Sequence, residues 1–78
     1  MNLRPGDLVT APGESGLESL MFRERSNQGL RVPFLRARRD SVMLVLAVVS
    51  AAGTVPQSMV LLEDCYGWMY CAHLKRVT

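Results

Sequence analysis

The sequence predicts a small all-β barrel. Short runs of apolar and β-branched residues alternate along the chain with clusters of turn-forming Gly, Pro, Asn, Asp and Ser. Only one segment carries a helical pattern, and it spans a turn or two at most. A chain of 78 residues has room for a single hydrophobic core, so we treat residues 1–78 as one domain.

The N-terminal half combines turn signals with short strands. Residues 3–10 read as a first strand entered through a Pro-Gly turn. Residues 15–21 have capping-box spacing and apolar residues at helical intervals, but an extended segment over residues 20–25 fits equally well. Residues 30–36 contain Pro33, which favours an edge strand or a bend because proline donates no ladder hydrogen bond.

The C-terminal half has the clearest strand signals. Residues 42–49 are all apolar and half of them are β-branched, which favours a strand. A further apolar run is followed by a polar turn and an aromatic segment, the pattern of a hairpin. We therefore expect strands over residues 42–49, 59–62 and 68–71, a turn at 63–67, a 3₁₀ turn at 72–74 and a last strand over 75–77.

Four segments resemble the bacterial SH3-like domain, and more narrowly the short SH3-like proteins that many tailed bacteriophages encode. The chain is similar to them at Pro5-Gly6-Asp7-Leu8-Val9, at residues 21–26, at residues 41–46 and across residues 59–74. The resemblance implies an SH3-like barrel of about five strands, with a long first loop over residues 11–39 and a 3₁₀ turn before the last strand. It also implies a protein without catalytic activity, located in a virion or in the bacterial host cytoplasm.

Several functional classes find no support in the residues. The N-terminus has no apolar h-region, so we expect no secretory signal peptide. The longest apolar run has eight residues, whereas a membrane span needs about 20. Cys65, Cys71 and His73 do not have the spacing of a zinc site, and reduced cysteines fit a reducing compartment. We expect no enzyme, no metal, no cofactor and no membrane partner.

The strand at residues 42–49 is apolar on both faces, although a small barrel has only one interior. Alternation predicts one face made of Val42, Leu44, Leu46 and Val48, and an outer face that includes Met43, Val45 and Val49. Three explanations stay open: the segment 11–39 covers the outer face, the strand bends so that parts of both faces are buried, or another chain covers it. If another chain covers this face, we expect Met43 and Val45 to contact a second copy or a larger assembly.

Basic residues are concentrated in one stretch. Eight of the nine basic residues are arginine, and six arginines with one glutamate give residues 23–39 a charge of +5, against −3 elsewhere. Within it, Arg36, Arg38 and Arg39 are candidate binding residues because the guanidinium fork suits carboxylates and phosphates. A solvated loop, a protein contact and nucleic acid all remain open.

Three aromatic residues follow one another at alternate positions. Trp68 and Tyr70 share one face of the predicted strand, and Tyr66 lies on the adjoining turn. Such residues anchor interfaces, and in several SH3-like domains aromatics at this place line the ligand groove. The alternative is that they supply bulk to the core.

These observations predict a non-enzymatic protein-interaction module. We expect a small phage accessory or virion-associated structural protein that docks on a larger assembly, its partner being a second copy or a phage structural protein. One alternative is a module that binds a bacterial wall peptide or a host factor through its aromatics. A second is a nucleic-acid-binding protein that uses the arginine-rich first loop.

Overall fold

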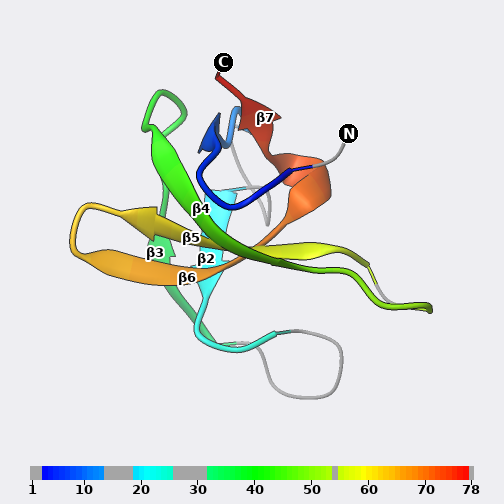
Figure 1. Ribbon diagram of the computed structural model, residues 1–78. Helices are drawn as coiled ribbons and strands as arrows, with labels where there is room; N and C mark the ends of the chain where they lie inside the picture. Colours follow the sequence, from blue (N-terminus) through cyan, green and yellow to red (C-terminus); the bar gives the residue numbers. More distant parts are fainter. Residues whose placement is uncertain (1–2, 14–18, 26–31, 54, 78) are drawn as a thin grey trace.

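The protein is all-β. The computed structural model describes residues 3–13, 19–25, 32–53 and 55–77. Within these residues there is no α-helix (Figure 1). The elements are β1 (Leu8–Thr10), β2 (Leu20–Phe22), β3 (Pro33–Arg36), β4 (Met43–Val49), β5 (Gln57–Leu62), β6 (Cys65–Tyr70), the 3₁₀ helix η2 (Cys71–His73) and β7 (Lys75–Arg76).

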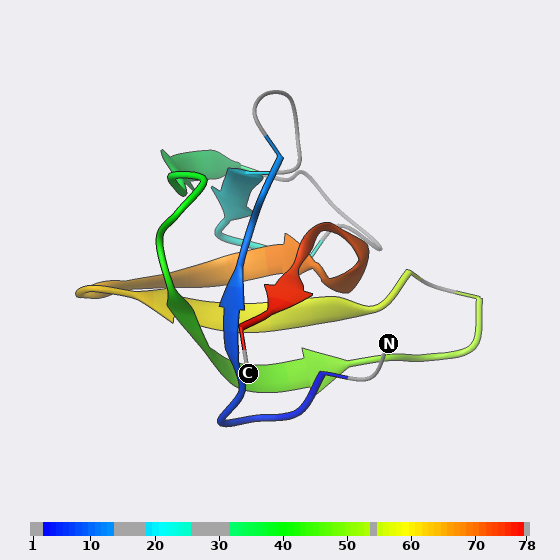
Figure 2. The ribbon, with the colours of Figure 1, turned by 90° about the horizontal axis from the view of Figure 1, so that it is seen from above.

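The strands form one antiparallel sheet in the order β3-β2-β6-β5-β4-β1-β7. The sheet is strongly bent: β4 pairs with β5 from Leu44 to Val49, and its first two residues pair with β1 on the other side (Figures 1 and 2). The two edge strands β3 and β7 are not paired with each other, so the sheet is unclosed.

The expected count of about five strands is wrong. Seven strands lie within the described residues, because residues 11–39, expected as a long loop, contribute the antiparallel pair β2 and β3. Of the two interpretations of residues 15–25, the extended one holds at β2, so the helical pattern over 15–21 does not continue through Leu20 and Met21; residues 15–18 lie outside the described residues. Pro33 lies in edge strand β3, as predicted, and the 3₁₀ turn before the last strand is confirmed as η2.

A β-bulge in β4 changes which side chains face the interior. Val45 is opposite Val60 and Ala47 is opposite Met59, so Leu46 is an extra residue in this strand. An extra residue reverses the alternation of faces beyond it. Val48 therefore packs against the core in the second half of the strand, although simple alternation places it on the opposite face from Met43.

The core is built from both halves of the chain. Its most deeply buried side chains are methionine and valine from the strands, completed by Leu3 and Leu74 at one end and by two small alanines. The buried cluster contains Leu3, Val9, Ala11, Met21, Ala37, Met43, Val45, Val60, Met69 and Leu74. Every buried side-chain nitrogen or oxygen among the described residues has a hydrogen-bond partner.

The β5–β6 connection is shorter than expected. Leu62 pairs with Cys65, so the turn is only Glu63–Asp64, and Glu63 has a φ of 57°, in the left-handed region. Tyr66 was expected on the turn, but it belongs to β6. The short turn therefore brings all three candidate aromatics onto one strand.

Candidate interaction surface

Met43 and Val45 do not form an outer binding face. Their side chains are 0% and 1% exposed, inside the core cluster. They pack there with Met21 and Ala37, which come from the segment 11–39. The prediction that Met43 and Val45 contact another chain is therefore wrong, because the protein's own segment covers them. Val49, placed on the same face, is only half-buried.

The opposite face of the β4–β5–β6 sheet is also apolar. Cross-strand neighbours in an antiparallel sheet share a face, so the register groups these side chains directly. Apart from Tyr66, which is exposed, they are half-buried. We call this set the outer face; it consists of Leu44, Leu61 and Tyr66, then Ala47, Met59 and Trp68, and lastly Val49 and Tyr70, between which the buried polar Gln57 is paired.

The hairpin that supplies most of this face carries no charge. Residues 41–62 contain no Asp, Glu, Lys, Arg or His over 22 positions. The hairpin extends beyond the rest of the molecule (Figure 2), and three of its large apolar side chains are well exposed: Val42 at 50%, Leu46 at 39% and Val55 at 55%. Surfaces of small proteins are normally interspersed with charge, so an uncharged, exposed hairpin indicates an interaction surface.

The three candidate aromatics lie along one face of β6. Tyr66 is 62% exposed at the end near the turn, and Trp68 is half-buried beside Met59 and Phe22, its cross-strand neighbours. Tyr70 packs edge-on against His73, with ring centroids 5.6 Å apart. All three lie on the outer face and none belongs to the buried core cluster, although Trp68 and Tyr70 are half-buried.

Two arginines that were not among the candidates lie beside these aromatics. The guanidinium carbon of Arg25 is 5.6 Å from the ring centroid of Trp68, and that of Arg23 is 5.0 Å from the ring centroid of Phe34. Both distances are within the range of a cation–π contact. The sequence contains one indication of this pair: the two arginines are two residues apart in the Arg-Glu-Arg triplet after β2, so they lie on the same side of an extended chain. Their ring partners, however, come from β3 and β6.

The predicted arginines form a separate group. Arg36 ends β3 and donates a hydrogen bond from Nη1 to the Ser19 hydroxyl at 2.7 Å, which ties it to the start of β2. Arg36, Arg38 and Arg39 line a hollow of about 470 Å³ together with Gly13, Ser19 and Ala37. Since β2 and β3 are antiparallel, this group and Arg23 lie at opposite ends of the hairpin, and the described arginines do not form one continuous stripe.

A groove lies between the end of the β2–β3 hairpin and the β5–β6 hairpin. We name it the Arg23 groove; its volume is about 420 Å³ and its lining is Arg23, Phe34, Met59, Asp64, Cys65, Tyr66 and Gly67. Gly67 has a specific role here. A Cβ at this position would lie 2.7 Å from Cε1 of Phe34 and 3.1 Å from the carbonyl oxygen of Phe22. The absence of a side chain is what allows the Phe34 ring to approach β6.

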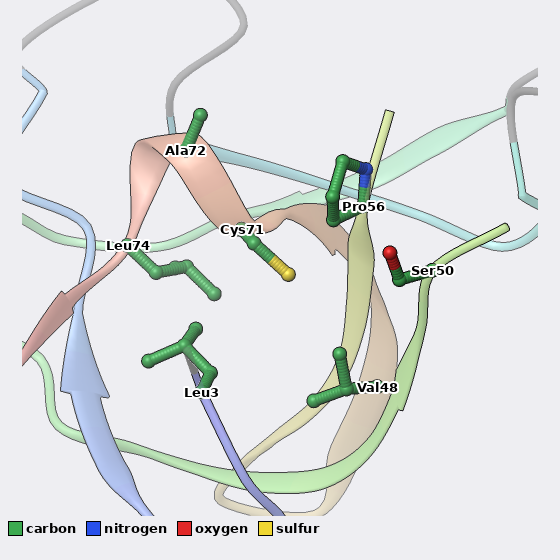
Figure 3. A pocket seen from close by; sticks show the side chains of 7 residues that line it. All are labelled: Leu3, Val48, Ser50, Pro56, Cys71, Ala72 and Leu74. Carbon is green, nitrogen blue, oxygen red and sulfur yellow. The ribbon is translucent and has the colours of Figure 1, made fainter. Parts of the chain in front are cut away.

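A second cavity, of about 490 Å³, lies at the base of the β4–β5 hairpin next to η2 (Figure 3). The side chains of Leu3, Leu74, Val48 and Cys71 surround it. The sulfur of Cys71 is 2.9 Å from the hydroxyl of the buried Ser58, so this polar pair is satisfied internally. Cys71 and the exposed Cys65 are both free thiols.

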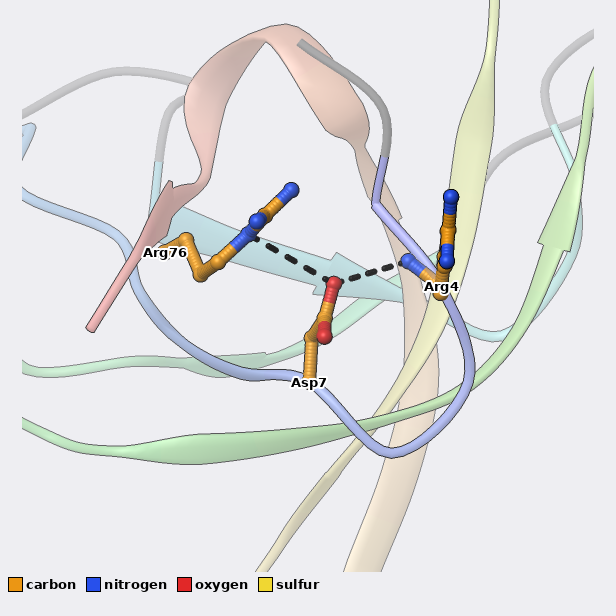
Figure 4. Close-up of polar contacts among 3 residues, drawn as sticks. All are labelled: Arg4, Asp7 and Arg76. Carbon is orange, nitrogen blue, oxygen red and sulfur yellow. Dashed lines mark hydrogen bonds and ion pairs between the residues drawn. The ribbon is translucent and has the colours of Figure 1, made fainter. Parts of the chain in front are cut away.

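Asp7, part of the Pro-Gly-Asp segment, has a structural role. Its Oδ2 accepts a hydrogen bond from the Arg4 backbone N–H at 2.9 Å and lies 3.7 Å from Nε of Arg76 (Figure 4). Pro5 and Gly6 occupy the two central positions of this turn, and Gly6 has a φ of +95°, the conformation that a type II turn requires there. The segment thus fixes the entry into β1 and links it to β7.

Metal-ligand clusters and membrane-spanning helices are both absent from the described residues. No three His, Cys, Asp or Glu side chains among them gather into a potential metal site. The same residues include no helix with the length and hydropathy of a membrane span.

Comparison of the chain with protein-family models, curated proteins and solved structures found no match.

Proposed function

We propose that this protein is a non-enzymatic protein-interaction module on an SH3-like barrel, which docks on a larger protein assembly as a phage accessory or virion-associated component. The single observation that supports this most is the uncharged β4–β5 hairpin and the apolar outer face beside it. The proposal for the fold is supported by the order of the elements, with η2 placed immediately before the last strand.

The outer face lies outside the hydrophobic core. The buried core cluster contains none of its apolar side chains, which are half-buried or exposed. Keeping large apolar side chains in water forgoes about 25 cal/mol for every Å² left exposed. A protein partner that covers Leu46, Val42 and their neighbours recovers that free energy on binding. An uncharged hairpin also imposes no cost for desolvating ions at such an interface.

The test is association with assembled particles. We expect the wild-type protein to co-sediment with purified virions at a fixed stoichiometry. Leu46→Glu places a charge on the exposed hairpin and should abolish this association, while circular dichroism stays that of the wild type. Val77→Glu is the matched control, because Val77 is 48% exposed and lies outside the hairpin; it should leave association intact.

Two results would remove the proposal. One is a protein that is absent from particles and stays monomeric in light scattering at high concentration. The other is equal loss of association in the Leu46→Glu and Val77→Glu variants, which would indicate that any added negative charge, and not the hairpin surface, is responsible.

A further inference from the structure

We propose that the Arg23 groove, together with the adjacent Arg25–Trp68 pair, binds an acidic segment of the partner protein, in which carboxylates flank an apolar side chain. This inference rests on the proposed function, because it names the chemistry of a protein partner. It concerns a surface different from the uncharged hairpin, so the two can fail independently.

The first support is the state of the two guanidinium groups. Arg23 and Arg25 are exposed, and neither forms an ion pair with a carboxylate in the part of the chain that the structure describes. Each guanidinium presents five N–H donors in a planar fork that matches a carboxylate. A bound carboxylate would therefore gain charge-assisted hydrogen bonds without first displacing an internal partner.

The second support is that both groups are held in place. The Arg23 guanidinium lies over Phe34, and Phe34 is itself seated against Gly67. The Arg25 guanidinium lies over Trp68, the next residue of β6. Positioning on a ring lowers the conformational entropy that a long side chain loses on binding. Met59 connects the two contacts, because it lines the Arg23 groove and is the cross-strand neighbour of Trp68.

The third support is the apolar lining between these cations and the turn. Phe34, Met59 and Tyr66 line the groove, and Tyr66 is 62% exposed. They offer a contact for one aliphatic or aromatic side chain of the partner. The combination of an apolar contact with cations beside it specifies a segment in which acidic residues alternate with a large apolar residue.

Acidic groups at the same site argue against nucleic acid. Asp64 lines the groove, and the exposed Glu24 lies between the two arginines. A phosphate backbone carries a negative charge at every nucleotide and would meet both carboxylates. A short protein segment can place its few carboxylates at Arg23 and Arg25 and an uncharged residue near Asp64.

The experiment measures binding of labelled synthetic peptides to the full chain by fluorescence anisotropy. The probe is an eight-residue peptide that alternates glutamate with phenylalanine; its counterparts replace every glutamate with glutamine, or every phenylalanine with alanine. We expect only the acidic, aromatic peptide to bind, with an affinity that falls as salt is raised. Arg23→Gln with Arg25→Gln should weaken binding at least about fivefold and flatten the salt dependence.

The matched control is Arg38→Gln. Arg38 is an exposed arginine at the other end of the hairpin and is also without an ion pair among the described residues. It should leave binding within about twofold, the range expected when no contact is lost. Equal weakening by Arg38→Gln, equal binding of the glutamine peptide, or no binding at about 1 mM peptide would overturn the inference. Tighter binding of a single-stranded oligonucleotide of equal charge would also overturn it.

Failure here is distinguishable from failure of the proposed function. Suppose that particle association remains sensitive to Leu46→Glu, but the double arginine variant associates normally and no acidic peptide binds. The proposed function is then retained, and the proposal of an acidic ligand is rejected. If the peptide binds as expected but the protein is absent from particles, binding of acidic segments by the Arg23 groove is supported and the virion-associated role is rejected.

Discussion

The two faces of the β4–β5–β6 sheet are both apolar, yet they serve different purposes. The inner face carries Met43, Val45 and Val60, which are almost completely buried, whereas the outer face carries Leu44, Leu61 and their neighbours, which stay half-exposed. The composition of the strands does not distinguish the faces. The difference lies in what packs against each. Met21 and Ala37 of the segment 11–39 complete the core on the inner face, whereas contacts to the outer face include Arg25 on Trp68 and His73 on Tyr70.

The largest expected effect comes from truncating a buried side chain of β4, compared with truncating an exposed one. Met43→Ala should lower the free energy of unfolding by about 2–4 kcal/mol, because a fully buried methionine leaves a cavity. Leu46→Ala should lower it by less than about 1 kcal/mol, because Leu46 is 39% exposed. Urea denaturation followed by circular dichroism measures both. Similar losses for the two variants would contradict the assignment of faces.

A smaller effect is expected at Gly67, where the β2–β3 hairpin closes over the inner face of β6. Gly67→Ala introduces a Cβ 2.7 Å from the Phe34 ring, and relief by movement of the ring is incomplete because a carbonyl oxygen is 3.1 Å away. We expect a loss of about 1–2 kcal/mol in urea denaturation. Gly67→Ala combined with Phe34→Leu should recover part of it. An unchanged stability would show that Phe34 does not pack there.

The inner face also holds one polar pair, and it should contribute less. Ser58→Ala removes the hydroxyl that lies 2.9 Å from the Cys71 sulfur. The expected loss is about 0.5–1 kcal/mol, the usual net contribution of a neutral hydrogen bond. Thermal denaturation of Ser58→Ala is compared with that of Ser41→Ala, because Ser41 is half-buried and its hydroxyl forms no hydrogen bond with the described residues. The comparison separates the buried contact from the loss of a hydroxyl. A gain in stability would mean that the pair is unfavourable.

The smallest effect concerns the turn that sets the register of both faces. Glu63 adopts a φ of 57°, which is unfavourable for a residue with a Cβ. Glu63→Gly should raise the free energy of unfolding by about 0.5–1 kcal/mol, since the relief of strain exceeds the added entropy of the unfolded chain. Asp64→Gly, at the neighbouring turn position without positive φ, should give no gain. Stabilisation by both substitutions would assign the effect to the lost charge.

Much of the local structure was predictable because it depends on neighbouring residues. Strand propensity identified β4, and the turn residues identified the β5–β6 hairpin. Pro33 indicated an edge strand or a bend, because proline has no N–H to donate to a neighbouring strand, and β3 is an edge strand. The resemblance placed the 3₁₀ turn before the last strand. The prediction that Trp68 and Tyr70 share one face of a strand holds for the same reason, because alternation is a property of the strand itself, whereas Tyr66 was expected on the turn and lies in β6.

Which face of β4 is buried in the core could not be predicted in the same way. Its two faces are equally apolar, so hydrophobic patterning does not select one as the interior, and the bulge at Leu46 shifts the alternation halfway along. Alternation therefore gave no basis for choosing the interior face, and Met43 and Val45 were predicted on the exterior. The ring contacts of Arg23 and Arg25 were missed for a related reason: their partners come from β3 and β6, distant in sequence.

By itself the sequence determined an all-β chain, its main strand segments and a charge distribution that leaves residues 41–62 uncharged. Only the tertiary structure decided which apolar face is the core, that β2 and β3 complete it, and that two arginines lie on the rings beside a groove. The physical reason is range. Propensity and turn chemistry act between neighbours in the chain, whereas burial and cation–π contacts depend on residues that only folding brings together.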